Sequence, residues 1–313
     1  MPKQIQPNHA DHISYYKDDF IKTIFDEGAV AQLKYDGERM LIHINGDKIY
    51  CTSRRFSKKT GQYMENQDKI PIVNEIFKEF INQHLGYTVI DCECYSKDWS
   101  TVAGILHSLP ERAIELQKEN PVKFACFDCL YYDGKDLREE RYLDRLAYLP
   151  KVLQFVKDRN CHPVNIMLVN SKQSVNTLMN FAIEQGFEGI VVKSLQRKYY
   201  DKGASLKCKK SETVDVVVVG YQDGRGKYEG QVGALKIGYY EPSTSEFVCI
   251  SNVNCGTDED RLDWTNNKDA LLHSVIEVKC QEITKKSLRH PVIVRRRPDK
   301  TFEMCTKETI FKE

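Results

Sequence analysis

The sequence predicts an α+β protein of two domains, a mixed domain of helices and strands over residues 1–213 and a small β-barrel over residues 214–313. The length of 313 residues exceeds that of most single domains and suits two. Up to about Thr213, apolar runs typical of strands alternate with helical patterns. Beyond it, short strand-like runs are separated by Gly-rich turns, which is typical of small barrels.

Composition indicates where the protein is located in the cell and in which state its cysteines are. The net charge is only +1, so a surface for nucleic acid must come from local basic patches. The N-terminus lacks the apolar core of a signal peptide, and no apolar run is long enough to span a bilayer. We therefore expect a protein of the cytoplasm or nucleus, without a membrane partner, whose 11 cysteines are free thiols. Cys92 with Cys94, and Cys126 with Cys129, lie in strand-like runs without a further pair at zinc-finger spacing, which favours buried thiols.

The first predicted elements surround a lysine. Residues 30–33 and 39–44 are predicted as strands joined by a Tyr-Asp-Gly turn, and an Asn-Gly turn leads to a strand over 48–51, so we expect a hairpin over 30–51. Further elements expected before Thr213 are helices over 71–85, 142–156 and 174–185 and strands over 89–95, 124–131, 189–193 and 205–210. The strands expected in the barrel are 214–220, 234–240, 247–253, 275–283 and 292–296.

Lys34 opens a Lys-Tyr-Asp-Gly segment at the first of these turns. A lysine amine has an ordinary pKa of about 10.4 and is protonated at pH 7. Neighbouring cations and burial disfavour the ammonium form, and this is how a lysine becomes a nucleophile. Taken alone, the segment is equally compatible with a strand that ends in a turn and carries an exposed lysine.

Two acids lie at the ends of apolar strands. Glu93 follows Cys92 in one run, and Glu188 precedes the apolar run 189–192. A carboxylate in such a place needs a partner. A hydrated divalent cation or a ribose hydroxyl would serve, and the alternative is a salt bridge to Arg39 or to a lysine.

A set of cations is available to neutralise a triphosphate. Lys207 and Lys209 alternate along one predicted strand and therefore point to one face. Lys193 ends the preceding strand, and Arg39 and Arg54 follow the lysine turn. The alternative for the paired lysines is a solvated edge strand that they protect from association.

The order of these features carries more weight than any one of them. The last is the basic run 295–300, which alone is compatible with a nuclear-localisation signal or a nucleic-acid patch. In this order the features resemble the covalent nucleotidyltransferase superfamily, and most of all its ATP-dependent DNA ligases of the small phage and viral type. The resemblance runs from about Ala29 to Lys300. The matching residues are Lys34, Asp36, Gly37, Arg39, Ser53, Arg54, Glu93, Phe127, Asp128, Glu188, Gly189, Lys193, Lys207, Lys209, Arg295, Arg297, Asp299 and Lys300.

Three positions depart from the family pattern. Cys92 stands where the family has a glycine before the essential glutamate, and the tryptophan that often precedes the paired lysines is missing. Gln32 stands two residues before Lys34, where ligases often have an acid that accepts a hydrogen bond from the adenine amino group. Because a glutamine carbonyl accepts the same bond, ATP remains the expected nucleotide.

The resemblance implies an ATP-grasp-like nucleotidyltransferase domain followed by an OB-fold. It also implies that Lys34 takes AMP from ATP and passes it to the 5′-phosphate of a DNA nick, where the 3′-hydroxyl displaces it. The implied catalytic residues are Lys34, Glu93, Glu188, Lys207 and Lys209, with Mg²⁺ held by Glu188 and Glu93. The implied nucleotide-binding residues are Gln32, Leu33, Lys34, Arg39, Arg54, Glu93, Phe127, Lys193, Lys207, Lys209, Arg295, Arg297 and Lys300.

The expected partner is nicked duplex DNA, bound by a monomer through its phosphates in replication, repair or recombination. The expected contacts are Arg54, Arg55, Lys58, Lys59, Arg225 and Lys227. Lys34 lies too near the N-terminus for a nicotinamide-binding module to precede it, which argues against an NAD-dependent ligase. The alternatives are an mRNA capping guanylyltransferase, an RNA ligase, and a non-catalytic DNA-binding protein with an OB-fold.

Overall fold

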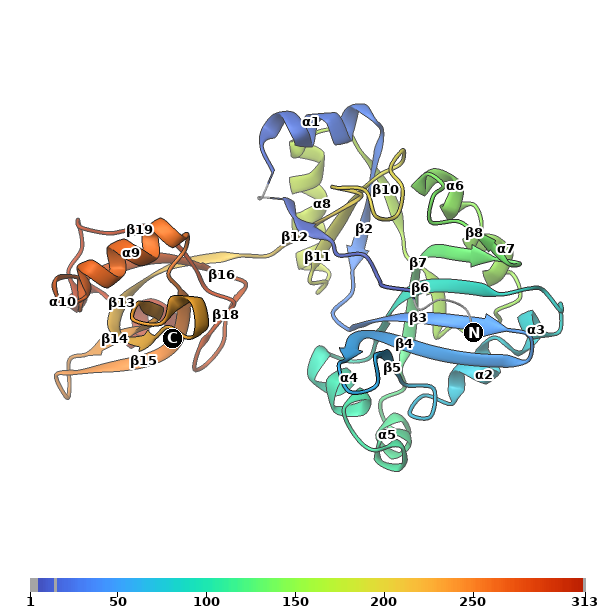
Figure 1. Ribbon diagram of the computed structural model, residues 1–313, viewed down its shortest axis with the longest axis horizontal. Coiled ribbons are helices and arrows are strands. Elements are labelled where there is room, and N and C mark those ends of the chain that lie inside the picture. The colour runs from blue at the N-terminus through green and yellow to red at the C-terminus, as the bar shows by residue number, and fades with distance from the viewer. Residues whose placement is uncertain (1–4, 14–15, 312–313) are drawn as a thin grey trace. The chain divides into compact units, whose positions relative to one another are not determined.

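The chain folds into two compact units, residues Met1–Lys209 (unit 1) and Lys210–Glu313 (unit 2), in the computed structural model (Figure 1). The structure describes residues 5–13 and 16–311. The division falls just before strand β13 (Glu212–Asp223). Thr213, the boundary expected from the sequence, therefore lies inside the first strand of unit 2. Among the described residues, no helix is both long and apolar enough to cross a membrane.

Unit 1 contains two sheets, here named sheet A and sheet B (Figure 1). Sheet A has the strand order β1-β12-β11-β2-β10, and sheet B follows the path β5-β4-β3-β6-β7-β8, with β9 beside β7. The strands of sheet A are β1 (Asp11–His12), β2 (Ala29–Lys34), β10 (Ile166–Val169), β11 (Gly189–Ser194) and β12 (Ser205–Lys209). The strands of sheet B are β3 (Glu38–Asn45), β4 (Lys48–Ser57), β5 (Gln62–Glu65), β6 (Thr88–Tyr95), β7 (Lys123–Tyr132), β8 (Lys135–Asp136) and β9 (Cys161–Pro163).

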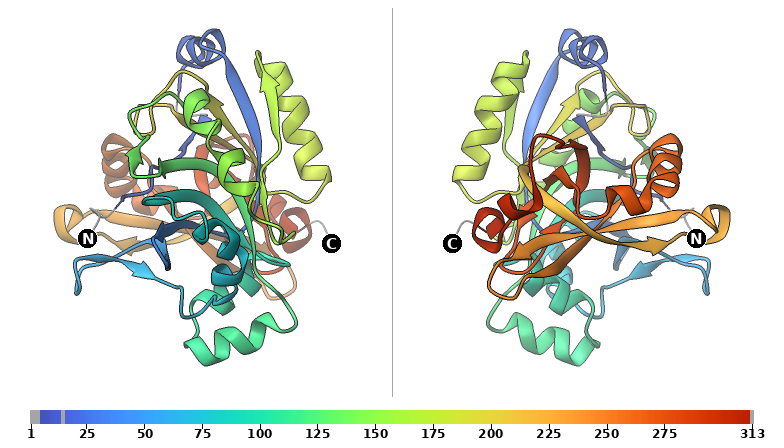
Figure 2. Two further views of the ribbon diagram at one scale, coloured as in Figure 1. Left: turned by 90° about the vertical axis from the view of Figure 1, so that its right-hand side faces the viewer. Right: turned by 90° about the vertical axis from the view of Figure 1, so that its left-hand side faces the viewer.

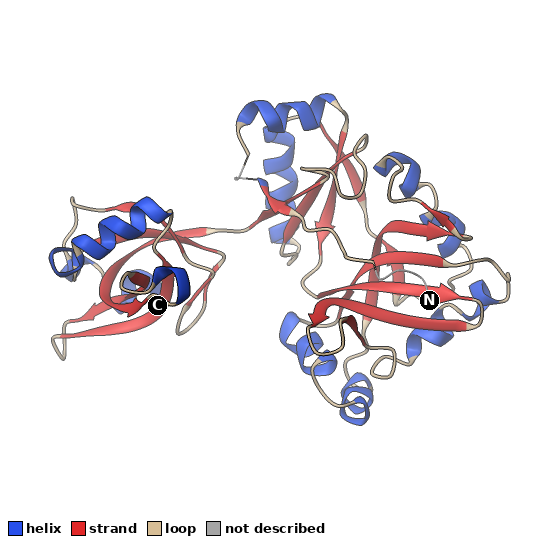
Figure 3. Cartoon of the chain, in the orientation of Figure 1, coloured by secondary structure: helices blue, strands red, loops and turns tan. Residues whose placement is uncertain are grey.

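Of the three helices expected in unit 1, those over 71–85 and 142–156 are each divided into two shorter helices, and the one over 174–185 is present nearly as expected (Figure 3). The helices of unit 1 are α1 (Asp18–Asp26), α2 (Ile72–Ile76), α3 (Lys78–Ile81), α4 (Trp99–Leu106), α5 (Pro110–Gln117), α6 (Tyr142–Leu146), α7 (Leu149–Leu153) and α8 (Lys172–Glu184). The expected helix over 71–85 is divided at Phe77, which leaves the helical region with φ −102° while its ring stays buried. The expected helix over 142–156 is also two helices, and Pro150 lies in the first turn of the second, where proline is tolerated.

Of the expected hairpin over 30–51, the first turn is wrong and the second is confirmed. Strand β2 pairs with β10 and β11 in sheet A, whereas β3 pairs with β4 and β6 in sheet B. The segment after Lys34 is therefore a crossing between two sheets and not a hairpin turn. Gly37 permits the crossing, because a Cβ atom there would lie 2.2 Å from the carbonyl oxygen of Cys94. The Asn45-Gly46 turn does join β3 and β4 as predicted, with Gly46 at a φ of 62°.

Each sheet packs an apolar face against helices, and its opposite face carries the polar residues, which in sheet B lie beside a small apolar cluster that includes Leu41 and Val89. In sheet A, helices α1 and α8 cover the face that carries Leu33, Ile190 and Leu206, and Figure 2 shows α8 running alongside β2. In sheet B, helices α2, α3, α4, α5 and α7 cover the face that carries residues such as Met40 and Cys92. Because successive side chains of a strand alternate between faces, the polar residues of both sheets are left on the other side.

Unit 2 is built on a closed barrel with the strand order β13-β14-β15-β19-β16. Its strands are β13, β14 (Val232–Glu241), β15 (Glu246–Asn254), β16 (Val275–Cys280) and β19 (Val292–Arg296), so all five expected strands are present. Trp264 of α9 (Asp258–Asn266) packs into the barrel core. The remaining elements are β17 (Glu282–Ile283), β18 (Leu288–Arg289), α10 (Lys268–Leu271), α11 (Lys307–Phe311), η2 (Gly226–Tyr228) and η3 (Phe302–Met304).

Candidate active site

Three strands of sheet A bring Lys34, Glu188 and Lys209 together. In the register of β2, β11 and β12, Gly189 lies opposite both Lys34 and Lys209. Gly189 has a φ of 150°, and a Cβ atom there would lie 2.1 Å from the carbonyl oxygen of Cys208, so glycine is required. The adjoining Glu188 forms ion pairs with both amines, one through each carboxylate oxygen. Its backbone N–H also donates to the carbonyl oxygen of Lys34 at 3.0 Å.

The electrostatics of this group are dominated by the lysines. Burial raises the pKa of Glu188, but the charges of Lys34 and Lys209 outweigh that effect and leave the pKa below its ordinary value. Burial lowers the pKa of Lys207, and the charges of Lys209, Lys34 and Arg54 lower it further. Lys207 lies opposite Val191 in the sheet, on the same polar face. The predicted cations Lys207 and Lys209 are thus gathered around Lys34.

Sheet B contributes Glu93 to the same group of charges, and the charged group that residues of the two sheets form together is here named the cleft. Glu93 on β6 lies opposite Arg39 on β3. Burial raises the pKa of Glu93 to about 7, although the charges of Lys34 and Arg39 oppose this shift. The alternative of a salt bridge between Glu93 and Arg39 is not observed, and no ion pair to Glu93 occurs within residues 5–13 and 16–311. Glu93 is therefore a desolvated carboxylate that faces the cations of sheet A.

Arg39 is fixed by residues that the sequence did not single out. Its Nε donates to Asp91 Oδ1 at 2.8 Å, and its second terminal nitrogen donates to Asn8 Oδ1 at 2.8 Å and to the Tyr199 hydroxyl at 3.0 Å. The Tyr199 hydroxyl in turn donates to Asp91 Oδ2 at 2.6 Å. Asp91 could have been found, since it is an acid in the same apolar strand as Glu93. The contacts of Asn8 and Tyr199 with Arg39 could not be predicted from the sequence, because both residues are far from Arg39 along the chain.

The predicted aromatic, Phe127, lies beside a buried polar group. The Nζ atom of Lys193 is 4.6 Å from the centre of the Phe127 ring and 3.9 Å from Asp128 Oδ2. Burial lowers the pKa of Lys193 to about 8. Asp128 receives two hydrogen bonds of 2.9 Å from Arg145. Lys193 therefore lies against the Phe127 ring and close to Asp128, and these contacts fix the position of its amine.

Leu33 is placed differently from the other predicted nucleotide-binding residues. Its side chain is buried in the core between sheet A and α8, on the face away from Lys34. The reason is the alternation of side chains along β2, which sends Gln32 and Lys34 to one face and Leu33 to the other. The prediction of Leu33 as a nucleotide contact is therefore wrong for its side chain.

The basic residues of β4 and the turn after it are divided in the same way. Arg54 is exposed, and its charge acts on both Glu93 and Lys207, so it faces the cleft. Arg55 lies on the opposite face, 3.9 Å from Glu38 Oε1. Lys58 and Lys59 are exposed in the turn that leads to β5. Only Arg54 of these four lies among the cleft residues.

In unit 2, two of the predicted basic residues share one acid. Arg297 donates to Asp215 at 2.9 and 3.0 Å, and Lys300 Nζ donates to Asp215 Oδ2 at 2.6 Å. Arg295 is instead exposed and paired with Glu277 at 2.6 Å. Asp215 thus holds Lys300 and Arg297 together within unit 2, whereas Arg295 is paired with Glu277, which lies opposite Asp215 in the barrel.

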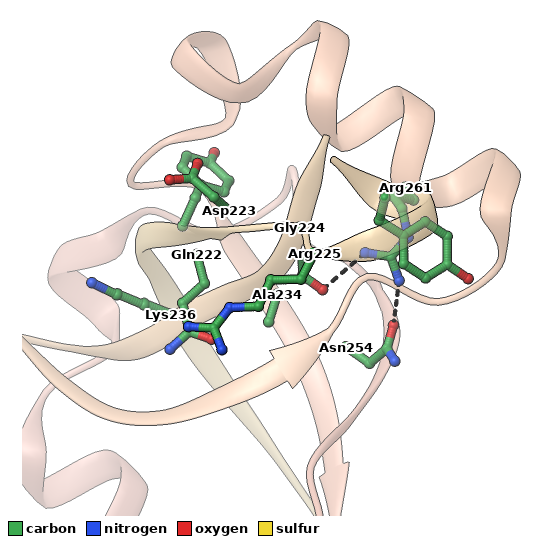
Figure 4. A pocket seen from close by; sticks show the side chains of 11 residues that line it. Gln222, Asp223, Gly224, Arg225, Ala234, Lys236, Asn254 and Arg261 are labelled. Atoms are coloured by element: carbon green, nitrogen blue, oxygen red, sulfur yellow. Dashed lines mark hydrogen bonds between the residues drawn. The ribbon is translucent and has the colours of Figure 1, made fainter. Parts of the chain in front are cut away.

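Unit 2 also has a polar cavity of about 870 Å³ beside the loop over residues 223–233, here named the Gly-rich loop (Figure 4). Arg225 and Lys236 line it and extend away from Arg261. Arg261 is buried and fixes the loop by donating to the Val232 carbonyl at 2.5 Å. Lys227 does not line this cavity and lies 3.9 Å from Asp258.

The carboxylates of unit 1 fit a cation that arrives with its own ligands. Within the described part of the chain, no group of three His, Cys, Asp or Glu side chains could hold a metal ion. Glu93 and Glu188 nevertheless act electrostatically on one another. Mg²⁺ usually keeps several waters and binds proteins through one or two carboxylates together with substrate phosphates. Two acids beside a cluster of lysines suit that mode.

Known proteins resemble the chain over most of its length. The family model described as ATP dependent DNA ligase domain matches residues 10–209. A DNA ligase of Staphylothermus marinus is 29% identical over 287 residues, which are 87% of this chain and 45% of that protein. The chain thus spans about half the length of the curated relatives it matches.

Solved structures show the same fold. The structure named Pmar-Lig_PreS3 has a TM-score of 0.72 at 19% identity, covering 93% of this chain and 67% of that one. A structure from a study of minimal Lig E DNA ligases has a TM-score of 0.66 at 16% identity, covering 94% of this chain and 99% of that one. The mixed α/β architecture of the chain is therefore that of DNA ligase catalytic domains.

Proposed function

The chain belongs to the family of ATP-dependent DNA ligase domains, and on this premise we propose that it seals nicks between a 5′-phosphate and a 3′-hydroxyl in duplex DNA, with Lys34 as the nucleophile. The observation that carries the proposal is the meeting of Lys34, Glu188 and Lys209 at one point of sheet A, opposite Glu93 of sheet B. A nucleophilic amine, two carboxylates and further cations are what nucleotidyl transfer to a lysine requires.

In the first step the Lys34 amine attacks the α-phosphorus of ATP. A phosphorus–nitrogen bond forms, the bond to the β-phosphate breaks, and pyrophosphate leaves while the amine loses its proton. Lys207 and Lys209 stabilise the charge on the α-phosphate. Glu188 and Glu93 would hold Mg²⁺, which neutralises phosphate oxygens when it is bound. Phe127 stacks on the adenine, and Arg39 contacts the ribose.

In the later steps the same cations act on DNA. The 5′-phosphate attacks the phosphorus of lysine-bound AMP, giving a DNA-adenylate and freeing Lys34. The 3′-hydroxyl then attacks the 5′-phosphate, and AMP leaves. Arg54 is suited to the 5′-phosphate because it is exposed and lies on the cleft side of β4. Arg55, Lys58 and Lys59 contact phosphates farther along the duplex without reading its sequence.

For unit 2 we propose an OB-fold that binds phosphates. Support comes from the closed barrel of five strands. Helix α9 gives further support, because it lies between β15 and β16 in the sequence, which are the third and fourth strands of the barrel in chain order. Lys300 and Arg297 bind the β- and γ-phosphates of ATP in the first step, with Arg295 at their margin. Arg225 and Lys227 in the Gly-rich loop contact DNA. The enzyme acts as a monomer.

A sealing assay tests this function. The purified protein is mixed with a 5′-phosphorylated nicked duplex, Mg²⁺ and either ATP, GTP or NAD, with Lys34→Ala as the control. We expect sealing with ATP alone and none by the variant. A covalent GMP adduct without sealing would instead establish a capping guanylyltransferase, and sealing by Lys34→Ala would remove the proposed nucleophile.

A further inference from the structure

Gln32 is held by a buried chain of hydrogen bonds. Its side chain shares the polar face of β2 with Lys34, and the residue is only 3% exposed. Gln32 Nε2 donates to the Tyr142 hydroxyl at 2.7 Å, and that hydroxyl donates to the carbonyl oxygen of Phe127 at 2.9 Å. Phe127 is also the residue proposed to stack on the base. These two hydrogen bonds therefore link Gln32 and Phe127, which lie on two sides of the proposed adenine site.

The chemistry of these groups fixes the direction of every bond in the chain. A backbone carbonyl can only accept, so the single proton of the Tyr142 hydroxyl is committed to Phe127. The hydroxyl oxygen can then only accept from Gln32, and only the NH₂ group of the Gln32 amide can donate to it. A flipped amide would place two acceptors against each other. With the Tyr142 proton donated to the Phe127 carbonyl, the NH₂ group of Gln32 is the end of the amide that faces the hydroxyl.

Tyr142 is itself rigidly placed. It is 1% exposed, and the centre of its ring lies 4.4 Å from the Nζ atom of Lys193 and 5.3 Å from the guanidinium carbon of Arg145. Lys193 Nζ also lies 3.5 Å from the Phe127 carbonyl oxygen, whose second lone pair can accept from it. The hydroxyl therefore has little freedom to turn toward another acceptor.

The consequence concerns the other end of the Gln32 amide. With its NH₂ committed, the carbonyl oxygen Oε1 is an acceptor to which no side chain or backbone group donates within the described residues. Adenine presents an amino donor at its C6 position, whereas guanine presents a carbonyl oxygen there. An acceptor held in place suits adenine and opposes guanine.

We propose that Tyr142 sets the choice of ATP over GTP, as a positioning residue that keeps the Gln32 carbonyl directed at the base. This inference rests on the proposed function, because it takes the nucleotide to bind with its base at Gln32. Without the hydroxyl, the amide could rotate and offer its NH₂ group to the guanine carbonyl. Tyr142 would then affect discrimination between nucleotides more than the chemical step.

The test compares wild-type protein with Tyr142→Phe in forming the covalent lysine–nucleotide adduct from ATP or GTP. We expect the ratio of kcat/KM for ATP to that for GTP to fall by about tenfold or more, mainly through KM. Tyr87→Phe is the matched control, since it removes another tyrosine hydroxyl of unit 1, one that lies 2.8 Å from His43 Nδ1 and does not contact Gln32. The control should keep the wild-type ratio.

Two further measurements separate positioning from a general loss of structure. Purine riboside triphosphate, which lacks the amino group, should be used far less well than ATP by the wild type and almost equally by Tyr142→Phe. In a Gln32→Ala background, Tyr142→Phe should leave the ratio unchanged. An unchanged ratio in Tyr142→Phe alone, or an equal loss with both nucleotides, would overturn the inference.

Equilibrium binding keeps this test apart from that of the proposed function. ATP and GTP affinities can be measured without turnover, so a protein that forms no adduct still reports its preference. Tighter ATP binding that weakens in Tyr142→Phe would support the inference even if sealing failed. Equal affinity of the wild type for both nucleotides would contradict it.

Discussion

Glu188 holds the side-chain amine of Lys34 in an ion pair, and its second carboxylate oxygen holds Lys209. Three neighbouring strands therefore converge on one carboxylate, and the glycine at position 189 allows β11 to lie this close to the backbone of Cys208 on β12. The position of the proposed nucleophile depends on this bridge more than on its own strand.

Replacing Glu188 by Gln should slow adduct formation by roughly a hundredfold, because a neutral amide cannot hold both amines and Lys34 is misplaced. The measurement is the rate at which the protein gains the mass of one AMP on incubation with ATP and Mg²⁺. Glu184→Gln, at an exposed position near the end of α8, is the matched control and should behave as wild type. Wild-type rates for Glu188→Gln would show that the bridge has no role in the reaction.

Lys300→Ala should impair the first step but spare the last. Lys300 shares Asp215 with Arg297 in unit 2 and is proposed to bind the phosphates that leave as pyrophosphate. Adduct formation should therefore fall by at least about tenfold, while sealing of DNA that already carries AMP should be nearly unchanged. Arg295→Ala should have a smaller effect, since Arg295 is exposed and paired with Glu277. Equal losses in both assays would argue against this assignment.

Arg225→Ala should weaken DNA binding and reduce the slope of log affinity against log salt by about 1, as expected for one lost phosphate contact. Lys227→Ala should give a smaller change of the same sign, because Asp258 lies 3.9 Å from its amine and already neutralises part of its charge. Fluorescence anisotropy of a labelled nicked duplex over a salt series measures both. A salt slope that neither variant changes would remove the Gly-rich loop from the DNA-binding surface.

His43 should make unit 1 sensitive to acid. It is buried, its Nδ1 and Nε2 lie 2.8 Å from the Tyr87 hydroxyl and 2.9 Å from Thr52 Oγ1, and burial lowers its pKa to about 4. An unfolded histidine titrates near 6.5, so between these values the unfolded chain binds more protons. The stability contributed by neutral His43 is full above pH 6.5 and is lost as the pH falls toward 4, by about 3 kcal/mol in total.

The check is urea unfolding of the wild type and of His43→Gln across that pH range. The variant keeps hydrogen-bonding groups but cannot titrate, so its free energy of unfolding should fall less steeply with acid. Parallel pH profiles for the two proteins would assign the acid sensitivity to other groups.

The sequence predicted the longer strands and most of the charged residues that gather near Lys34, because apolar periodicity and alternation are local properties. The face shared by Lys207 and Lys209 followed from alternation alone, and so would the exclusion of the Leu33 side chain. The pairing of β2 with β11 was not predictable from local patterns, and only the family resemblance placed Lys34 and Glu188, 154 residues apart, in one site. Tyr142 was missed for the same reason, since its bond to Gln32 spans 110 residues.

The crossing at Tyr35, Asp36 and Gly37 ties the two sides of the cleft by a covalent tether. Lys34 is fixed in sheet A and Glu38 in sheet B, so four peptide steps limit their Cα atoms to at most roughly 14 Å apart. Any movement of one sheet relative to the other must therefore keep these two Cα atoms within that distance. The AMP proposed to become attached to Lys34 would stay within reach of residues from both sheets in every step of the proposed reaction.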